Sequence, residues 1–117
     1  MGKTAIVLRR SPYGDINAAE AVRHAMGAAA DEMSVDLILV DAGVLLAKQG
    51  QDDTDTGFTN LGETLTDCIE MGVDVYADKH SIREQDMDTA DIPEGIKVVN
   101  GSEIADIIKN AKTTMIY

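Results

Sequence analysis

A chain of 117 residues with 44% hydrophobic and 26% charged residues has the composition of one globular domain large enough to bury a core. Its single cysteine excludes an internal disulfide framework and a cysteine-rich zinc site, and points to a reducing compartment. The formal net charge is −11, so the surface repels phosphate backbones and nucleic acid is not expected as a direct partner. We interpret the acidic excess as a well-solvated surface.

No targeting or cofactor signal stands out along the chain. The apolar run at 4–8 is short and ends at Arg9 and Arg10, which does not fit an export signal. No stretch approaches the roughly 20 apolar residues that a membrane-spanning helix needs. The chain has no GxGxxG or Walker-type loop, and its acidic segment 51–57 does not match an EF-hand. We therefore expect a cytoplasmic protein without a membrane partner, a metal or a cofactor.

Strands and helices alternate along the chain. The first strand is predicted at 4–8, where a continuous apolar run is typical of a strand covered on both faces. A long helix follows, marked by apolar residues at helical spacing: Ala19, Val22, Met26, Ala29 and Met33. The remaining predicted elements are a strand at 35–40, a short helix at 43–47, a helix at 60–71, a strand at 73–77, a short helix from about Ser81, a strand at 96–99, a helix at 102–110 and a strand at 113–117.

Several helix starts carry the spacing of a capping box, in which a short polar side chain caps the first turn and a glutamate follows three residues later. The pairs with this spacing are Asn17 with Glu20, Asn60 with Glu63, and Ser81 with Glu84. Ser102, after Asn100 and Gly101, is a further candidate cap. These signals place the helix starts close to the ends of the preceding strands or loops.

The alternation predicts an α/β fold in a single domain that spans 1–117. Strands joined through helices require right-handed crossovers, which give a mostly parallel five-stranded sheet with helices on both faces. Ligands of such sheets bind beyond the carboxyl ends of the strands. The candidate ligand-binding residues at this rim are Ser11, Tyr13, Gly14, Asp41, Asp78, Lys79 and His80.

The turn before the first long helix has two interpretations. Free N–H groups and the positive end of the helix dipole would suit an anion near Tyr13 and Gly14. A Pro–Gly turn that only reverses the chain explains the same residues equally well.

Several short segments occur in the order and spacing of a known family. They are Ser11-Pro12-Tyr13-Gly14 before an alanine-rich helix, Asp41-Ala42-Gly43-Val44, Lys48-Gln49-Gly50-Gln51, Gly57-Phe58 and the ending Met115-Ile116-Tyr117. In these segments the chain resembles the DsrE/DsrF-like proteins of the sulfur-relay group, which include the TusC and TusD subunits. The resemblance implies a three-layer α/β/α sandwich, a homotrimer or homohexamer, other sulfur-relay proteins as partners, and sulfur carried as a cysteine persulfide.

The chain departs from this family at the sulfur-accepting position. The resemblance puts the acceptor cysteine just after the third strand, behind the segment that reads Gly72-Val73-Asp74-Val75 here, and the position falls on Asp78. A second cysteine of some relatives would fall near Ser81. A persulfide needs a sulfur nucleophile with thiolate character, which a carboxylate cannot replace. This difference argues against sulfur transfer at Asp78.

Cys68 is a candidate to replace the missing acceptor. Helical geometry places it between Leu61 and Leu65, at the centre of an apolar stripe. We therefore expect a buried thiol with a raised pKa and little reactivity. Sulfur transfer through Cys68 would require this helix face to open toward the rim.

The two histidines have different expected environments. His24 lies on the far side of its helix from Val22 and is expected to face solvent or a neighbouring subunit. His80 stands two residues after Asp78, and an Asp–His pair can perform acid–base chemistry near neutral pH. A surface or capping role for His80 is the alternative, with Ser81 as a helix cap. Lys79 and Arg83 fit either anion attraction or surface ion pairs.

Three functions are compatible with these features. The first is an oligomeric accessory or small-ligand-binding subunit of intracellular sulfur metabolism that lacks the usual acceptor cysteine. The second is a sulfurtransferase or sulfur carrier that uses Cys68. The third is a small enzyme built on Asp78 and His80 as catalytic residues. We favour the first, and whether the protein is an enzyme stays open.

Overall fold

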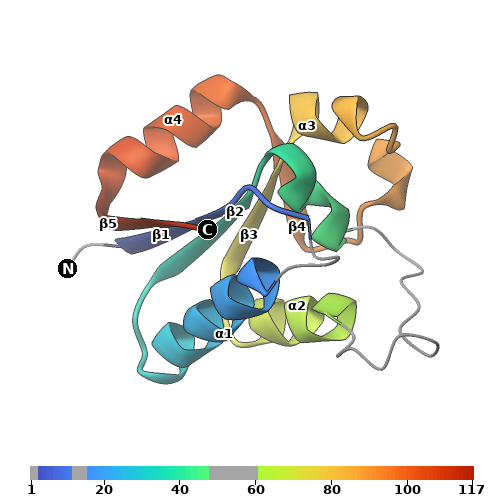
Figure 1. Cartoon of the computed structure of the whole chain (residues 1–117). Coiled ribbons are helices and arrows are strands. Elements are labelled where there is room, and N and C mark those ends of the chain that lie inside the picture. Colours follow the sequence, from blue (N-terminus) through green and yellow to red (C-terminus); the bar gives the residue numbers. More distant parts are fainter. Residues whose placement is uncertain (1–2, 12–15, 48–60) are drawn as a thin grey trace.

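The computed structural model describes residues 3–11, 16–47 and 61–117, with side chains from residue 65 onward in the last range (Figure 1). Five strands form one sheet in this part of the chain: β1 (Lys3–Leu8), β2 (Val35–Leu39), β3 (Asp74–Asp78), β4 (Ile96–Val99) and β5 (Ala111–Ile116). Their order in the sheet is β4-β3-β2-β1-β5, and every neighbouring pair is parallel. The predicted α/β fold class is therefore confirmed.

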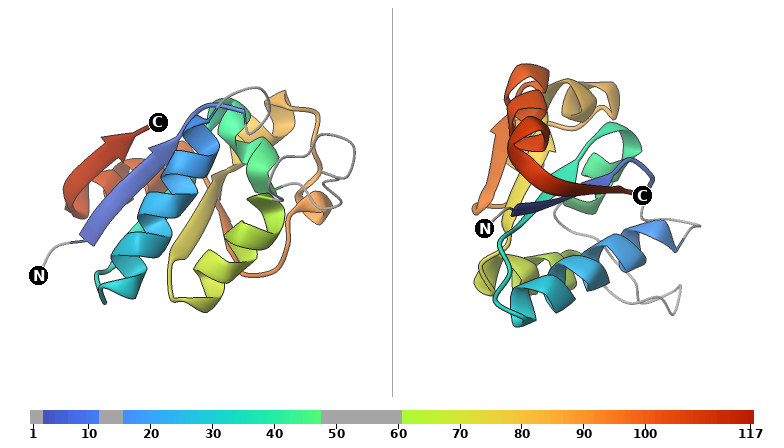
Figure 2. Two further views of the ribbon diagram at one scale, coloured as in Figure 1. Left: turned by 60° about the horizontal axis from the view of Figure 1, so that its bottom comes forward. Right: turned by 90° about the vertical axis from the view of Figure 1, so that its left-hand side faces the viewer.

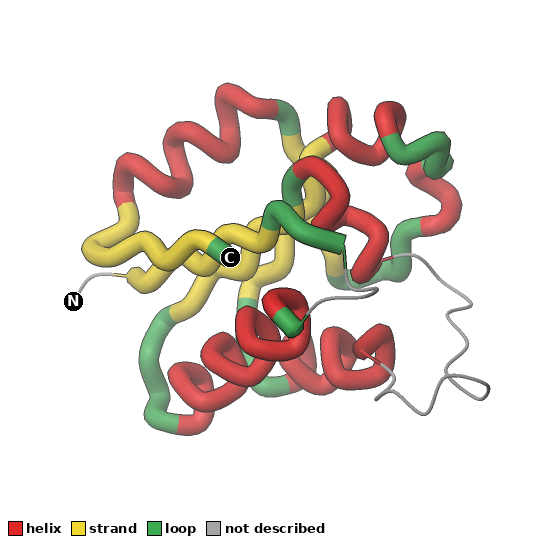
Figure 3. Tube along the Cα trace, viewed as in Figure 1, coloured by secondary structure: helices red, strands yellow, loops and turns green. Residues whose placement is uncertain are grey.

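Helices cover both faces of the sheet. They are α1 (Asn17–Ala30), the 3₁₀ helix η1 (Asp41–Ala47), α2 (Leu61–Glu70), α3 (Lys79–Glu84), the 3₁₀ turn η2 (Thr89–Asp91) and α4 (Gly101–Asn110). In Figure 2, α1 and α2 lie side by side on one face, while α4 crosses the opposite face. Figure 3 shows the same three layers along the Cα trace. Within the described residues, no helix combines the length and apolar character needed to cross a membrane.

The element bounds agree with the sequence-based prediction to within two residues, apart from the C-terminal end of α1 and the unpredicted turn η2. The buried stripe of α1 also differs from the prediction. It consists of Ala18, Ala21, Val22 and Ala25, which follow the i, i+3, i+4, i+7 pattern of one helix face. Of the residues predicted for this stripe, Ala19 is exposed and Met33 lies beyond the helix end.

Two cores lie on the two faces of the sheet. Because side chains alternate along a strand, Ile6 and Leu8 of β1 enter the larger core under α1 and α2, while Val7 enters the smaller core under α4. Both sets are buried, which explains why the residues of β1 from Ala5 to Leu8 are all apolar.

Alternating charges join the amino ends of four neighbouring strands on the α4 face. The Nζ atom of Lys3 on β1 lies 3.0 Å from Oδ1 of Asp36 on β2 and 3.1 Å from Oδ2 of Asp74 on β3. Lys97 on β4 reaches the other oxygen of Asp74 at 3.6 Å. The Asp36 side chain is only 4% exposed, and its hydrogen bond raises the pKa of the Lys3 ammonium group. We call these four residues the charge ladder.

Three of the predicted helix caps, Asn17, Ser81 and Ser102, differ from the caps in the structure. Ile16, not Asn17, is the N-cap of α1, and no side chain makes a capping hydrogen bond there. Asp78 rather than Ser81 caps α3, because the last residue of β3 is already extended and its carboxylate accepts the Ser81 N–H. Asn60 lies outside the described residues.

At the start of α4 the cap is Asn100, not Ser102. The Asn100 side chain accepts the backbone N–H of Glu103 at 2.9 Å, and Glu103 in turn accepts the N–H of Asn100. This capping box lies two residues before the predicted cap because the turn begins directly at the end of β4.

Gly43 allows η1 to pack directly on the end of β1. A Cβ atom added at Gly43 would lie 2.2 Å from the carbonyl oxygen of Leu8, which is closer than non-bonded atoms can approach. The same oxygen accepts the N–H of Val40, so it cannot retreat without loss of a hydrogen bond. The contact fixes the corner between β2 and η1 against β1.

Replacement of Gly43 by alanine should therefore lower the free energy of unfolding by roughly 1–3 kcal/mol, the usual cost of overpacking. The matched control is Gly27→Ala in α1, where an added Cβ meets nothing within 4 Å. That change should raise stability by roughly 0.5–1 kcal/mol, because alanine is the better helix former. Urea denaturation of both variants is the measurement, and equal effects would contradict the close contact.

Candidate functional site

Polar residues from three strand ends meet at the carboxyl edge of the sheet. Arg9, just after β1, places its Nε atom 3.1 Å from Oδ2 of Asp41, which follows β2. The backbone N–H of Asp41 donates to Oγ of Ser81 at 2.8 Å. The Ser81 hydroxyl then donates to Oδ2 of Asp78, at the end of β3, at 2.6 Å. We call these four residues the rim chain.

The structure thus brings together two of the predicted rim residues, Asp41 and Asp78, through a residue with a different predicted role. Ser81 is 3% exposed and lies inside α3. Its hydroxyl uses both its donor and an acceptor position, and its N–H also binds Asp78 at 3.2 Å. A buried polar side chain that is fully hydrogen-bonded stabilises the corners that it connects.

The backbone of Asp41 contributes to this geometry. Its φ angle is 51°, in the left-handed region that aspartate tolerates better than most residues. This conformation occurs where the chain leaves β2 and enters η1, and the Asp41 N–H there reaches the hydroxyl of Ser81. Sequence reasoning missed Arg9 and the bridging role of Ser81. The available signal was an aspartate at a strand end with serine three residues later, the spacing of an N-cap bond.

His80 and Asp78 have different partners. Nε2 of His80 lies 2.8 Å from Oε1 of Glu84 one helical turn away, and the imidazole is 78% exposed. Oδ2 of Asp78 is held by Ser81. Of the two alternatives for His80, its contacts therefore fit the surface role, while Asp78 pairs with Ser81.

The other candidate residues are located as follows. Ser11 follows β1 and is partly buried, and Lys79 and Arg83 are exposed on α3. Tyr13, Gly14 and the acidic segment 51–57 lie outside the described residues. His24 is exposed on α1, and its ring hydrogen-bonds the Tyr117 hydroxyl. The described side chains include no group of three or more His, Cys, Asp or Glu residues that could hold a metal ion.

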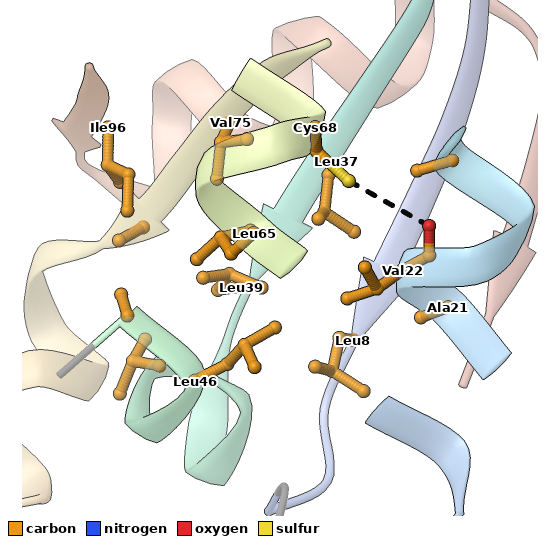
Figure 4. Close-up of a cluster of buried hydrophobic side chains, with 14 of the residues drawn as sticks. Leu8, Ala21, Val22, Leu37, Leu39, Leu46, Leu65, Cys68, Val75 and Ile96 are labelled. Carbon is orange, nitrogen blue, oxygen red and sulfur yellow. Dashed lines mark hydrogen bonds between the residues drawn. The ribbon is translucent and has the colours of Figure 1, made fainter. Parts of the chain in front are cut away.

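Cys68 lies in the larger core, away from solvent, as predicted. In Figure 4 it stands among buried side chains of the sheet and α1, with its thiol donating to the carbonyl oxygen of Val22 at 3.8 Å. Burial, with a smaller contribution from the negative charge of Asp67, raises the pKa of the Cys68 thiol from 9.0 to about 11. The thiol is therefore neutral and inaccessible near neutral pH.

The fold and this site define a class of protein: a parallel α/β sandwich whose rim has a serine-bound carboxylate at the end of the third strand. The model of the DsrE/DsrF-like family matches residues 2–116, and the chain belongs to this family. Membership connects the protein with sulfur metabolism.

Similar proteins span nearly the whole chain. MK0008, an uncharacterized protein of Methanopyrus kandleri, is 27% identical over 112 residues, which cover 96% of this chain and 91% of the relative. The crystal structure of the YchN protein from Escherichia coli matches with a TM-score of 0.91 at 21% identity, over 100% of both chains. The structure of MTH1491 from Methanobacterium thermoautotrophicum, a protein of unknown function, matches over 100% of both chains with a TM-score of 0.78 at 14% identity. The structural matches show that the fold is shared.

The rim chain predicts the effect of removing the Ser81 hydroxyl. Ser81→Ala leaves the Asp41 N–H without this acceptor and removes one donor from Asp78, so we expect a loss of about 1–3 kcal/mol in the free energy of unfolding. The control is Ser102→Ala, an exposed serine in the first turn of α4, which should change stability by less than about 0.5 kcal/mol. Equal stability of the two variants in urea would contradict the bridge.

The environment of Cys68 predicts its reactivity. A rise of two pKa units lowers the thiolate fraction at pH 8 by about 100-fold, and burial slows labelling further. A thiol reagent should therefore label the native protein at least about 100 times more slowly than the urea-unfolded chain, with a rate that increases as the pH approaches 11. Cys68→Ser is the blank for this assay, since the chain has no other cysteine. Similar rates for native and unfolded protein would contradict the buried position.

Proposed function

We propose that the protein is an oligomeric accessory or small-ligand-binding subunit of intracellular sulfur metabolism. In this proposal its rim lacks the usual cysteine that accepts sulfur as a persulfide. One observation carries the proposal: the rim position at the carboxyl end of β3 holds Asp78, whose carboxylate accepts two hydrogen bonds from Ser81. A carboxylate cannot form a persulfide, which argues against sulfur transfer at this position and favours a role in binding a ligand or a partner.

The state of Cys68 supports the same conclusion. Transfer through this residue would need an exposed thiolate. The thiol is instead fully buried in the larger core, and burial opposes its ionisation. The contacts of His80 likewise favour a surface role over acid–base chemistry with Asp78, because its imidazole pairs with Glu84.

Exposed apolar residues support self-association as a homotrimer or homohexamer. Ile16 at the start of α1, and Met115 and Ile116 on β5, remain exposed in the single chain. Exposed large apolar side chains of this kind are often covered at an interface between subunits. Other sulfur-relay proteins are the proposed partners of the assembly, and the cytoplasm is its proposed location.

A sulfur-acceptance assay tests the proposal. The protein is incubated with a cysteine desulfurase and cysteine, and native mass spectrometry follows the mass. Wild type should gain no sulfur, whereas Asp78→Cys should gain one, because its thiolate would lie beside the two Ser81 donors that now bind Asp78. Asp78→Ser is the matched control, since its hydroxyl cannot carry sulfur.

Two outcomes would contradict the proposal. A sulfur gain in wild type that disappears in Cys68→Ala would make the protein a carrier that uses Cys68. A folded Asp78→Cys variant that gains no sulfur would contradict the assignment of position 78 as the acceptor site of this rim.

A further inference from the structure

The strand β5 forms one edge of the sheet in the described part of the chain. It pairs with β1 on one side only, and five of its six residues, from Lys112 to Ile116, are exposed. Ile116 is 67% exposed. An edge strand of this kind has a row of backbone N–H and C=O groups that can pair with another strand.

The hydrogen bonds of Tyr117 show which backbone groups face outward. Its N–H donates to the carbonyl of Val7 at 2.8 Å, and its carbonyl accepts the N–H of Arg9 at 2.9 Å. Both groups of one residue in a parallel strand point to the same side, and successive residues alternate. The backbone groups of Tyr117 therefore point toward β1. The backbone N–H and C=O groups of Ile116 and Thr114 point away from the sheet.

The features that usually protect an edge are confined to the amino end of β5, where Lys112, its single charge, lies at a shift of register against β1. From Thr113 to Ile116 the strand has no charge and no proline, and its register with β1 is regular. Two threonines and an isoleucine favour the extended conformation. In a chain with a net charge of −11, β5 itself has no acidic side chain that would meet one of a second copy.

The strand is also complementary to itself. In an antiparallel pair centred on Thr114, the two Thr114 residues exchange both hydrogen bonds through their outward groups. Ile116 then lies opposite Lys112, whose aliphatic stem can cover it, and Thr113 lies opposite Met115. No lysine faces another lysine in this register.

We propose that the β5 edge is a twofold interface at which a second copy of this chain adds its own β5, centred on Thr114. The inference rests on the proposed self-association and specifies its surface. A twofold contact gives an isologous interface, and in a homohexamer it joins two trimers into one closed assembly.

The outward N–H of Thr114 provides the test. Thr114→Pro removes this donor but leaves the bonds to β1, because proline is tolerated where an edge N–H faces solvent. Thr114→Val is the matched control, since it keeps the N–H and changes only the side chain. Light scattering at micromolar concentration in moderate salt should show an even-numbered wild-type assembly, half its mass for Thr114→Pro, and an unchanged mass for Thr114→Val.

Two charge variants test the register and do not depend on proline. Ile116→Lys places a lysine opposite Lys112 of the second copy and should raise the dissociation constant by about tenfold or more. Ile116→Glu forms an opposite-charge pair there and should associate more tightly than Ile116→Lys. The net charge alone predicts the reverse order, because glutamate adds to the acidic excess.

The outcomes separate this inference from the proposed function. A monomeric wild type would overturn both the interface and the proposed self-association. An odd-numbered wild-type assembly, or a Thr114→Pro variant of unchanged mass, would overturn the β5 interface alone. The sulfur-acceptance result for Asp78 is independent of all these variants, because β5 contributes no residue to the rim chain.

Discussion

The central strand β2 is buried along its whole length, and its carboxylate, Asp36, is buried with it. A carboxylate in that position is stable only with a positive partner, and Lys3 supplies it at 3.0 Å from the neighbouring strand. Lys3 also binds Asp74, so one ammonium group connects the amino ends of β1, β2 and β3. A slip of β2 by one residue would turn Asp36 into the apolar core under α1 and α2, which makes the charge ladder a constraint on register.

The sheet end with the charge ladder and the end with the rim chain have different roles. At the amino ends, the residues satisfy one another's charges and tie the strands together. At the carboxyl ends, Asp41 and Asp78 hold exposed or half-buried carboxylates on a scaffold fixed by buried Ser81 and by the Gly43 contact. Substitution at position 78 therefore changes the chemistry of the rim while the ladder still holds the strands in register.

Local patterns in the sequence were sufficient to predict the fold class. Ala5 to Leu8 are all apolar because both faces of β1 are covered, and the stripe around Cys68 predicted its burial. The caps were less predictable, because an asparagine three residues before a glutamate occurs inside a helix as well as at its start, as at Asn17. Long-range polar contacts could not be derived: nothing local to Lys3 indicates Asp36, and nothing local to Asp41 indicates Ser81.

The rim chain also has a mechanical consequence. Arg9, Asp41, Ser81 and Asp78 belong to three corners that are distant in sequence, yet each touches the next through a hydrogen bond or an ion pair. The Ser81 hydroxyl has one proton, which it gives to Asp78 while it receives the N–H of Asp41. The Ser81 side chain is therefore a shared contact of the corner after β2 and the corner after β3. The three corners are thus joined by one continuous series of polar contacts along the carboxyl edge of the sheet.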